Sequence, residues 1–87
     1  MNYRIVWSKQ AHRHFRKLDK PVRERAAITI EALSGNPRPP GVEPVMSMPG
    51  VFRIRKGDYR VLYSIEDEQR EVWIEDVRHR SKAYGGH

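Results

Sequence analysis

The stretch VFRIRKGDYRVLYSIEDEQREVWIEDV, residues 51–77, determines the fold class of this chain. Three runs rich in β-branched and aromatic residues, 51–55, 59–65 and 71–77, are separated by short polar turns. Turns of this length join neighbouring antiparallel strands, because a parallel crossover needs a dozen or more residues. The stretch therefore predicts a three-stranded antiparallel meander.

The residues before this stretch predict another strand and two helices. Residues 2–7, NYRIVW, alternate as a strand does, and Ser8 is a suitable N-cap for a helix with apolar residues at helical spacing up to Leu18. A second helix begins at a cap formed by Asp19 or Lys20 and ends at Gly35. Two helices joined by so short a link are expected to form a hairpin.

Residues 35–50, GNPRPPGVEPVMSMPG, are expected to form one loop, since they hold five of the six prolines. The element order is then β-α-α-β-β-β. We expect residues 1–87 to form a single α+β domain, with the helical hairpin on one face of a small, mostly antiparallel sheet.

Alternation along the strands predicts that several cationic groups share the face that the helices leave open. The side chains expected beneath the helices are Phe52, Ile54, Val61 and Tyr63. The opposite face then carries Arg53, Arg55 and Arg60. The third strand of the meander ends beside the same face with Arg78, His79 and Arg80. Cationic groups from separate segments thus converge on one surface.

Composition limits the classes of partner. The chain has 17 Lys and Arg against 11 Asp and Glu, a net charge of +6, and no cysteine. This charge attracts polyanions such as nucleic acid or an acidic protein, and the absence of cysteine excludes disulfides and thiolate zinc sites. No segment has the roughly 20 apolar residues that span a bilayer, so we expect a cytoplasmic protein without a membrane partner.

In these features the chain resembles the RelE-type toxins of toxin–antitoxin pairs, within the RelE/ParE superfamily. The likeness extends over the whole chain and is strongest in FRIR…DYRVLY and in VRHRSKAY, residues 77–84. The resemblance implies an mRNA endoribonuclease that acts in the ribosomal decoding site without metal or cofactor. It implies a reaction in which the 2′-hydroxyl of the substrate attacks the adjacent phosphate. It also implies contacts with ribosomal RNA and a RelB-like antitoxin, acidic where it wraps the toxin in a hetero-oligomer.

The resemblance also implies roles for particular residues. The residues expected to take part in catalysis are Arg60, Arg78, His79 and Tyr84. Those expected to bind substrate are Arg53, Arg55, Lys56, Arg80 and Lys82. Guanidinium groups suit phosphate oxygens because they are planar, permanently charged and bidentate. An imidazole titrates near neutrality and suits proton transfer, and a tyrosine can stack on a base or transfer a proton.

Other residues are expected outside the site. His12 and His14 are assigned to a surface helix, whose basic face over residues 9–17 is solvated or contacts ribosomal RNA. The large aromatic residues assigned to the core or to antitoxin contact are Trp7, Phe15 and Trp73. No histidine or carboxylate spacing suggests a metal site.

Two other functions are compatible with the sequence. One is a ParE-type toxin, which uses the same fold to inhibit DNA gyrase and generally lacks the full set of basic, histidine and tyrosine residues. The other is a basic RNA-binding protein without catalysis. Arginine at positions 53 and 55, where several RelE-type toxins carry lysine, keeps this last reading open.

Overall fold

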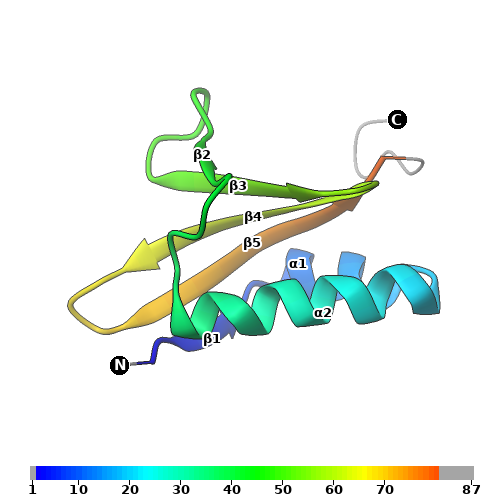
Figure 1. Ribbon diagram of the computed structural model, residues 1–87, viewed down its shortest axis with the longest axis horizontal. Helices are drawn as coiled ribbons and strands as arrows, with labels where there is room; N and C mark the ends of the chain where they lie inside the picture. Colours follow the sequence, from blue (N-terminus) through cyan, green and yellow to red (C-terminus); the bar gives the residue numbers. More distant parts are fainter. Residues whose placement is uncertain (1, 81–87) are drawn as a thin grey trace.

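The computed structural model describes residues 2–80 and confirms the α+β fold (Figure 1). Two helices lie on one side of a five-stranded sheet. The elements, in chain order, are β1 (Arg4–Trp7), α1 (Lys9–Arg16), α2 (Lys20–Gly35), β2 (Glu43–Pro44), β3 (Val51–Lys56), β4 (Tyr59–Glu66) and β5 (Glu71–His79). We call the sheet surface away from the helices the open face.

The strand order is β1-β5-β4-β3-β2, and only β1 with β5 is a parallel pair. The predicted meander is confirmed as β3, β4 and β5. The prediction of one continuous loop over residues 35–50 is wrong at Glu43 and Pro44, which pair with Arg53 and Phe52. A proline at this position is compatible with pairing because β2 is an edge strand.

The helix boundaries follow the caps expected from the sequence. The hydroxyl of Ser8 accepts a hydrogen bond from the Ala11 amide at 3.0 Å. Asp19 is the N-cap residue of α2, although its side chain makes no capping bond. The helices bury their apolar sides on a core of Ile54, Tyr59, Val61, Tyr63, Val72, Ile74 and Val77. No helix among residues 2–80 is long and apolar enough to cross a membrane.

A β-bulge in β5 determines which of its side chains face the helices. Leu62 lies opposite Asp76 while Tyr63 lies opposite Ile74, so Glu75 is an additional residue in β5. Ile74 and Val77 are therefore both fully buried, although strict alternation would place them on opposite faces. After the bulge, Arg78 turns to the open face.

Hydrogen bonds of two tyrosines and an aspartate hold the segment after α2 and the β4–β5 turn in place. The hydroxyl of buried Tyr63 donates to the Pro37 carbonyl at 2.7 Å, and burial raises the pKa of Tyr63 to about 12. Asp67, in the β4–β5 turn, accepts from the Tyr3 hydroxyl at 2.6 Å and from both terminal nitrogens of Arg38 at 3.2 and 2.9 Å. One carboxylate thus joins three distant segments.

Candidate functional site

Three arginines form a line across three adjacent strands of the open face. Arg55 of β3 lies opposite Arg60 of β4, and Arg60 lies opposite Arg78 of β5. We call these three residues the arginine row. Directly opposed like charges destabilise a sheet, so the row costs stability in the free protein. A local violation of this kind is expected where a bound anion balances the charge.

Arg53 lies one step along β3 from the row and adds a carboxylate to the open face. Its terminal nitrogen donates to Glu43 of β2 at 2.9 Å, and this bond, together with the charge of Arg53, lowers the pKa of Glu43. The buried Nε of Arg53 has no partner within residues 2–80. Glu43 was missed because its segment, rich in proline and glycine, predicts a loop rather than an edge strand.

Arg78 is held by a buried carboxylate two residues earlier in β5. Its Nε donates to Asp76 at 2.8 Å, and Asp76 also contacts Nδ1 of His14 at 2.6 Å. His14 is only 7% exposed, so its assignment to the surface is wrong. The signal was present in the sequence, because His14 lies three residues after Ala11 and four before Leu18, on the apolar stripe of α1.

His79 does not lie with the arginine row. Its cross-strand partner is Tyr59, whose hydroxyl donates to the Arg25 carbonyl of α2, so this position faces the helices. Nε2 of His79 lies 3.1 Å from Asp58 in the β3–β4 turn, and Asp58 also pairs with Arg25. The expectation that His79 joins the same face as Arg78 is wrong, because adjacent residues after the bulge point to opposite sides.

Of the remaining candidate residues, two lie in the described part of the chain and two do not. Lys56 lies opposite Tyr59 and lines a hollow against α2, so it too is away from the row. Arg80 is exposed, and its backbone amide donates to the Asp58 carbonyl at 2.8 Å. Lys82 and Tyr84 lie outside the described residues. Within residues 2–80, no three histidine or carboxylate side chains could hold a metal ion together.

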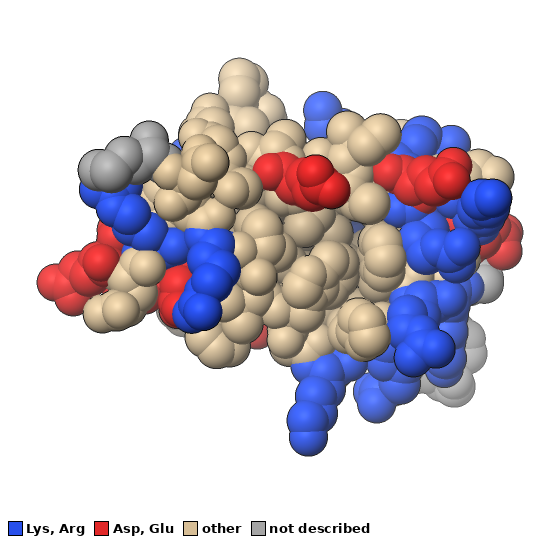
Figure 2. Space-filling model, turned by 90° about the horizontal axis from the view of Figure 1, so that it is seen from below, with Lys and Arg blue, Asp and Glu red and all other residues tan. Residues whose placement is uncertain are grey.

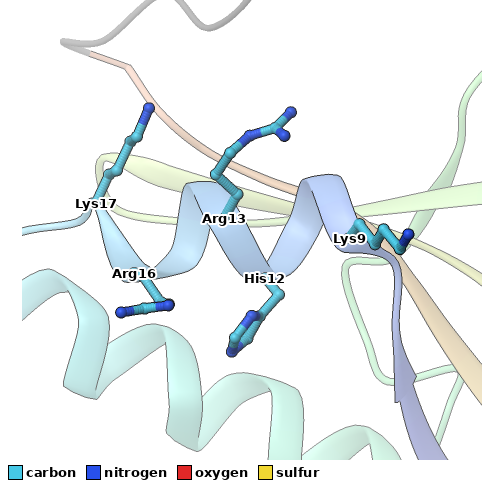
Figure 3. Close-up of a pocket in the computed structure, with 5 residues that line it drawn as sticks. All are labelled: Lys9, His12, Arg13, Arg16 and Lys17. Atoms are coloured by element: carbon cyan, nitrogen blue, oxygen red, sulfur yellow. The ribbon is translucent and has the colours of Figure 1, made fainter.

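A second basic surface lies on α1. An open hollow is lined by Lys9, His12, Arg13, Arg16 and Lys17 (Figure 3). His12 and Arg16 extend toward α2, whereas Arg13 and Lys17 extend away from it. On the helical side as a whole, Lys and Arg gather mainly toward one end, and the centre is largely uncharged (Figure 2).

Large apolar side chains also reach the surface. Trp73 is 41% exposed, and its Nε1 donates to Glu71 at 3.0 Å. Trp73 lies opposite Ser64 and therefore on the open face. Trp7 and Phe15 instead pack edge to face against one another beside the core, with ring centroids 5.0 Å apart.

The chain is similar to toxins of known type over nearly its full length. Residues 5–84 match the family model described as "ParE toxin of type II toxin-antitoxin system, parDE". Toxin RelG of Mycobacterium tuberculosis is 37% identical, with 97% of this chain and 98% of the relative covered. Toxin RelE of the same organism is 30% identical, with 94% and 86% covered.

Solved structures show the same arrangement. The RelBE2 toxin–antitoxin complex of M. tuberculosis contains a chain with a TM-score of 0.82 and 29% identity, covering 94% of this chain and 95% of that one. The RelE–RelB complex of Pyrococcus horikoshii gives a TM-score of 0.78 and 27% identity, with 95% and 100% covered. On this agreement of sequence and fold, the chain belongs to the ParE toxin family of type II toxin–antitoxin systems, within the RelE/ParE superfamily.

Proposed function

We propose that this toxin is a ribosome-dependent mRNA endoribonuclease that works without a metal ion. The observation that carries the proposal is the arginine row on the open face. Three guanidinium groups on rigid strands provide a place for one phosphodiester of an extended RNA strand. Their fork geometry suits the equatorial oxygens of a phosphorane, where negative charge increases during the reaction.

In the proposed reaction, the 2′-oxygen of the substrate attacks the adjacent phosphorus. A base removes the 2′-hydroxyl proton, and an acid gives a proton to the departing 5′-oxygen, so the products are a 2′,3′-cyclic phosphate and a 5′-hydroxyl. Arg60, at the centre of the row, is assigned to stabilise the phosphorane. Arg55 and Arg78 bind the same phosphate or its neighbours on either side.

The arginines cannot be the base, because guanidinium groups stay protonated in proteins. Glu43 is the carboxylate that the structure places beside Arg53, although its pairing with Arg53 lowers its pKa and so weakens it as a base. We assign Glu43 as the proton acceptor. Tyr84 keeps its sequence-based assignment to base stacking or proton donation, and His79 is assigned no contact with the phosphate.

The proposed partners are the programmed ribosome, with its mRNA and ribosomal RNA, and a RelB-like antitoxin. Relatives of known structure form complexes with RelB proteins in M. tuberculosis and P. horikoshii. An antitoxin with acidic segments would neutralise the row in the same way as RNA and so block the site. This predicts a toxin–antitoxin hetero-oligomer for this chain.

The substitution Arg60→Ala tests the assigned activity. We expect it to lower the cleavage rate at least a hundredfold, because it removes the central charge that stabilises the phosphorane. Cleavage is measured by primer extension on an mRNA during translation, and folding by circular dichroism. Arg4→Ala is the matched control, since Arg4 is exposed on β1 and pairs with Glu71 away from the row. Full cleavage by Arg60→Ala would refute the assignment.

A gyrase inhibitor is the second candidate, because the matching family model is described as a ParE toxin. Inducing the toxin in growing cells separates the candidates, because mRNA cuts and DNA breaks can both be measured there. Cuts inside reading frames support the nuclease, whereas double-strand DNA breaks without mRNA cuts support a gyrase inhibitor. If purified toxin binds ribosomes but causes neither mRNA cuts nor DNA breaks, the chain is a basic RNA-binding protein without catalysis.

A further inference from the structure

His14 and Asp76 are the buried polar side chains of the part of the chain that the structure describes, and they contact each other. They come from segments 62 residues apart, α1 and β5. Burying a carboxylate and an imidazole requires desolvation that an apolar pair of similar volume avoids, so this contact is a poor way to gain stability. The hydrogen bond from Arg78 of the arginine row to Asp76 suggests a functional reason.

The carboxylate of Asp76 has all its hydrogen-bonding positions occupied. Oδ1 lies 2.6 Å from Nδ1 of His14 and accepts from the Val77 amide at 2.8 Å. Oδ2 accepts from Gln10 at 3.0 Å and from Nε of Arg78 at 2.8 Å. An ionised carboxylate has about four such positions, so Asp76 is held on every side and cannot rotate without losing bonds.

Helix α1 supplies two of these four contacts because of where it lies. β1 pairs along the outer edge of β5 as far as Ile74, and Ser8 then bonds to the carbonyls of Ile74 and Glu75. The helix continues along this edge, which brings Gln10 and His14 to Asp76. The position of Asp76 therefore depends on the docking of α1.

Arg78 uses only its Nε to bind Asp76. A guanidinium has five N–H groups, so four remain on the two terminal nitrogens for a ligand. The side chain of Arg78 is 48% exposed while that of Asp76 is 4% exposed, so Arg78 is anchored to a buried carboxylate while about half of its side chain stays open to solvent. This is the arrangement expected for a guanidinium fixed in orientation beside Arg60.

We propose that Asp76 is a positioning residue for Arg78, and that Gln10 and His14 hold Asp76 in place from α1. The inference rests on the proposed nuclease activity. Asp76 also reduces the positive charge of the row, so it would be unfavourable if the row only attracted RNA. Its benefit lies in the orientation of Arg78, which matters for the reaction more than for binding.

The substitution Asp76→Asn separates these effects. We expect the single-turnover rate to fall tenfold to a hundredfold, because a displaced guanidinium stabilises the phosphorane poorly. Binding is expected to be equal or tighter, because one negative charge is removed. The rate is measured on ribosomes programmed with an mRNA of mapped cleavage site. Binding is measured by fluorescence anisotropy with the same mRNA carrying 2′-deoxyribose at that site.

Gln10→Ala provides a milder second variant, since Gln10 is exposed and its loss leaves the core intact. We expect a several-fold lower rate with an unchanged melting temperature. In an Arg78→Ala background, neither substitution should reduce the rate further, because the residue that they position is gone. Equal reductions with and without Arg78 would show that Asp76 acts elsewhere and would overturn the inference.

A spectroscopic measurement keeps the inference testable apart from activity. In ¹H–¹⁵N spectra, Nε–H of Arg78 should be protected from solvent exchange in the unsubstituted toxin and lose this protection in Asp76→Asn. Fast exchange in the unsubstituted toxin overturns the inference. If Arg78→Ala cuts RNA at the full rate, the proposed function of the row fails even where this protection is observed.

Discussion

Asp67 shows how one exposed carboxylate can hold the fold together. Hydrogen bonds from Arg38 and Tyr3 lower its pKa to about 2. A lowered pKa stabilises the folded state above the ordinary value near 3.8, and this stabilisation is lost as the pH falls through about 2.

We therefore expect Asp67→Asn to lower the melting temperature at neutral pH, and to lower it less as the pH approaches 2. Thermal unfolding followed by circular dichroism between these pH values measures the difference. Glu68→Gln is the control, because the Glu68 side chain is exposed in the same turn and makes no ion pair within residues 2–80. A pH-independent difference would show that packing, and not charge, explains the effect of Asp67→Asn.

Tyr84 can act through its ring or through its hydroxyl, and two substitutions distinguish these roles. We expect Tyr84→Phe to lower the cleavage rate, because it removes a proton donor while it keeps the ring. The rate is measured with the programmed ribosomes described above. If Tyr84→Phe cuts normally and Tyr84→Ala does not, stacking on a base is the function of the ring.

Single residues were predictable where alternation was regular. Arg55 and Arg60 meet on the open face as their strand positions predict. His79 and Arg78 were predicted together, but the strand separates them because adjacent side chains point to opposite faces. The contact of His14 with Asp76 joins distant segments, and no local pattern shows which buried histidine meets which carboxylate.

Helix α1 combines two roles on its two sides. One side docks on β5 through His14, and the other carries cationic residues with no acidic residue in the first turn. Like charges four residues apart, such as Lys9 and Arg13, destabilise an isolated helix. This exposed basic surface is either solvated or, as we propose, in contact with the phosphates of ribosomal RNA.

We expect the double substitution Arg13→Gln/Arg16→Gln to weaken binding to programmed ribosomes. The dependence of log K on log salt should become shallower by about 1 to 2, because each lost phosphate contact removes about one released counterion. Binding is measured by sedimentation at several salt concentrations. An unchanged slope would indicate that α1 does not contact RNA. Arg4→Gln/Arg70→Gln is the control for net charge, because it also removes two exposed cations, one on β1 and one in the β4–β5 turn.

The elements themselves were largely predictable, since caps and periodicity are local properties. Ser8 begins α1 and Gly35 ends α2, as the sequence indicates. The edge strand β2 was not predictable, because Glu43 and Pro44 have no strand pattern of their own. Pairing with β3 alone places them in the sheet, and with them the carboxylate that neighbours Arg53.

The topology of the whole sheet explains why part of the site could not be predicted from the sequence. The parallel pairing of β1 with β5 joins the first and last strands, and no local signal predicts it. This pairing sets the course of α1 along β5, and so the contact from α1 to Asp76, which binds Arg78. The net charge of +6 indicated an anionic partner, but only the topology shows where the charges are aligned.

Glu75 gives β5 one residue more than its neighbour, and the register that follows this bulge decides which side chains of β5 reach the open face. Loss of Glu75 itself would leave Arg78 opposite Arg60, whereas a one-residue shift of register that pairs Glu75 with Leu62 would exchange inner for outer positions in the rest of the strand. Arg78 would then point into the apolar interior, and His79 would take its place at the working surface. The bulge at Glu75 thus keeps an arginine, and not a histidine, on the open face with Arg60.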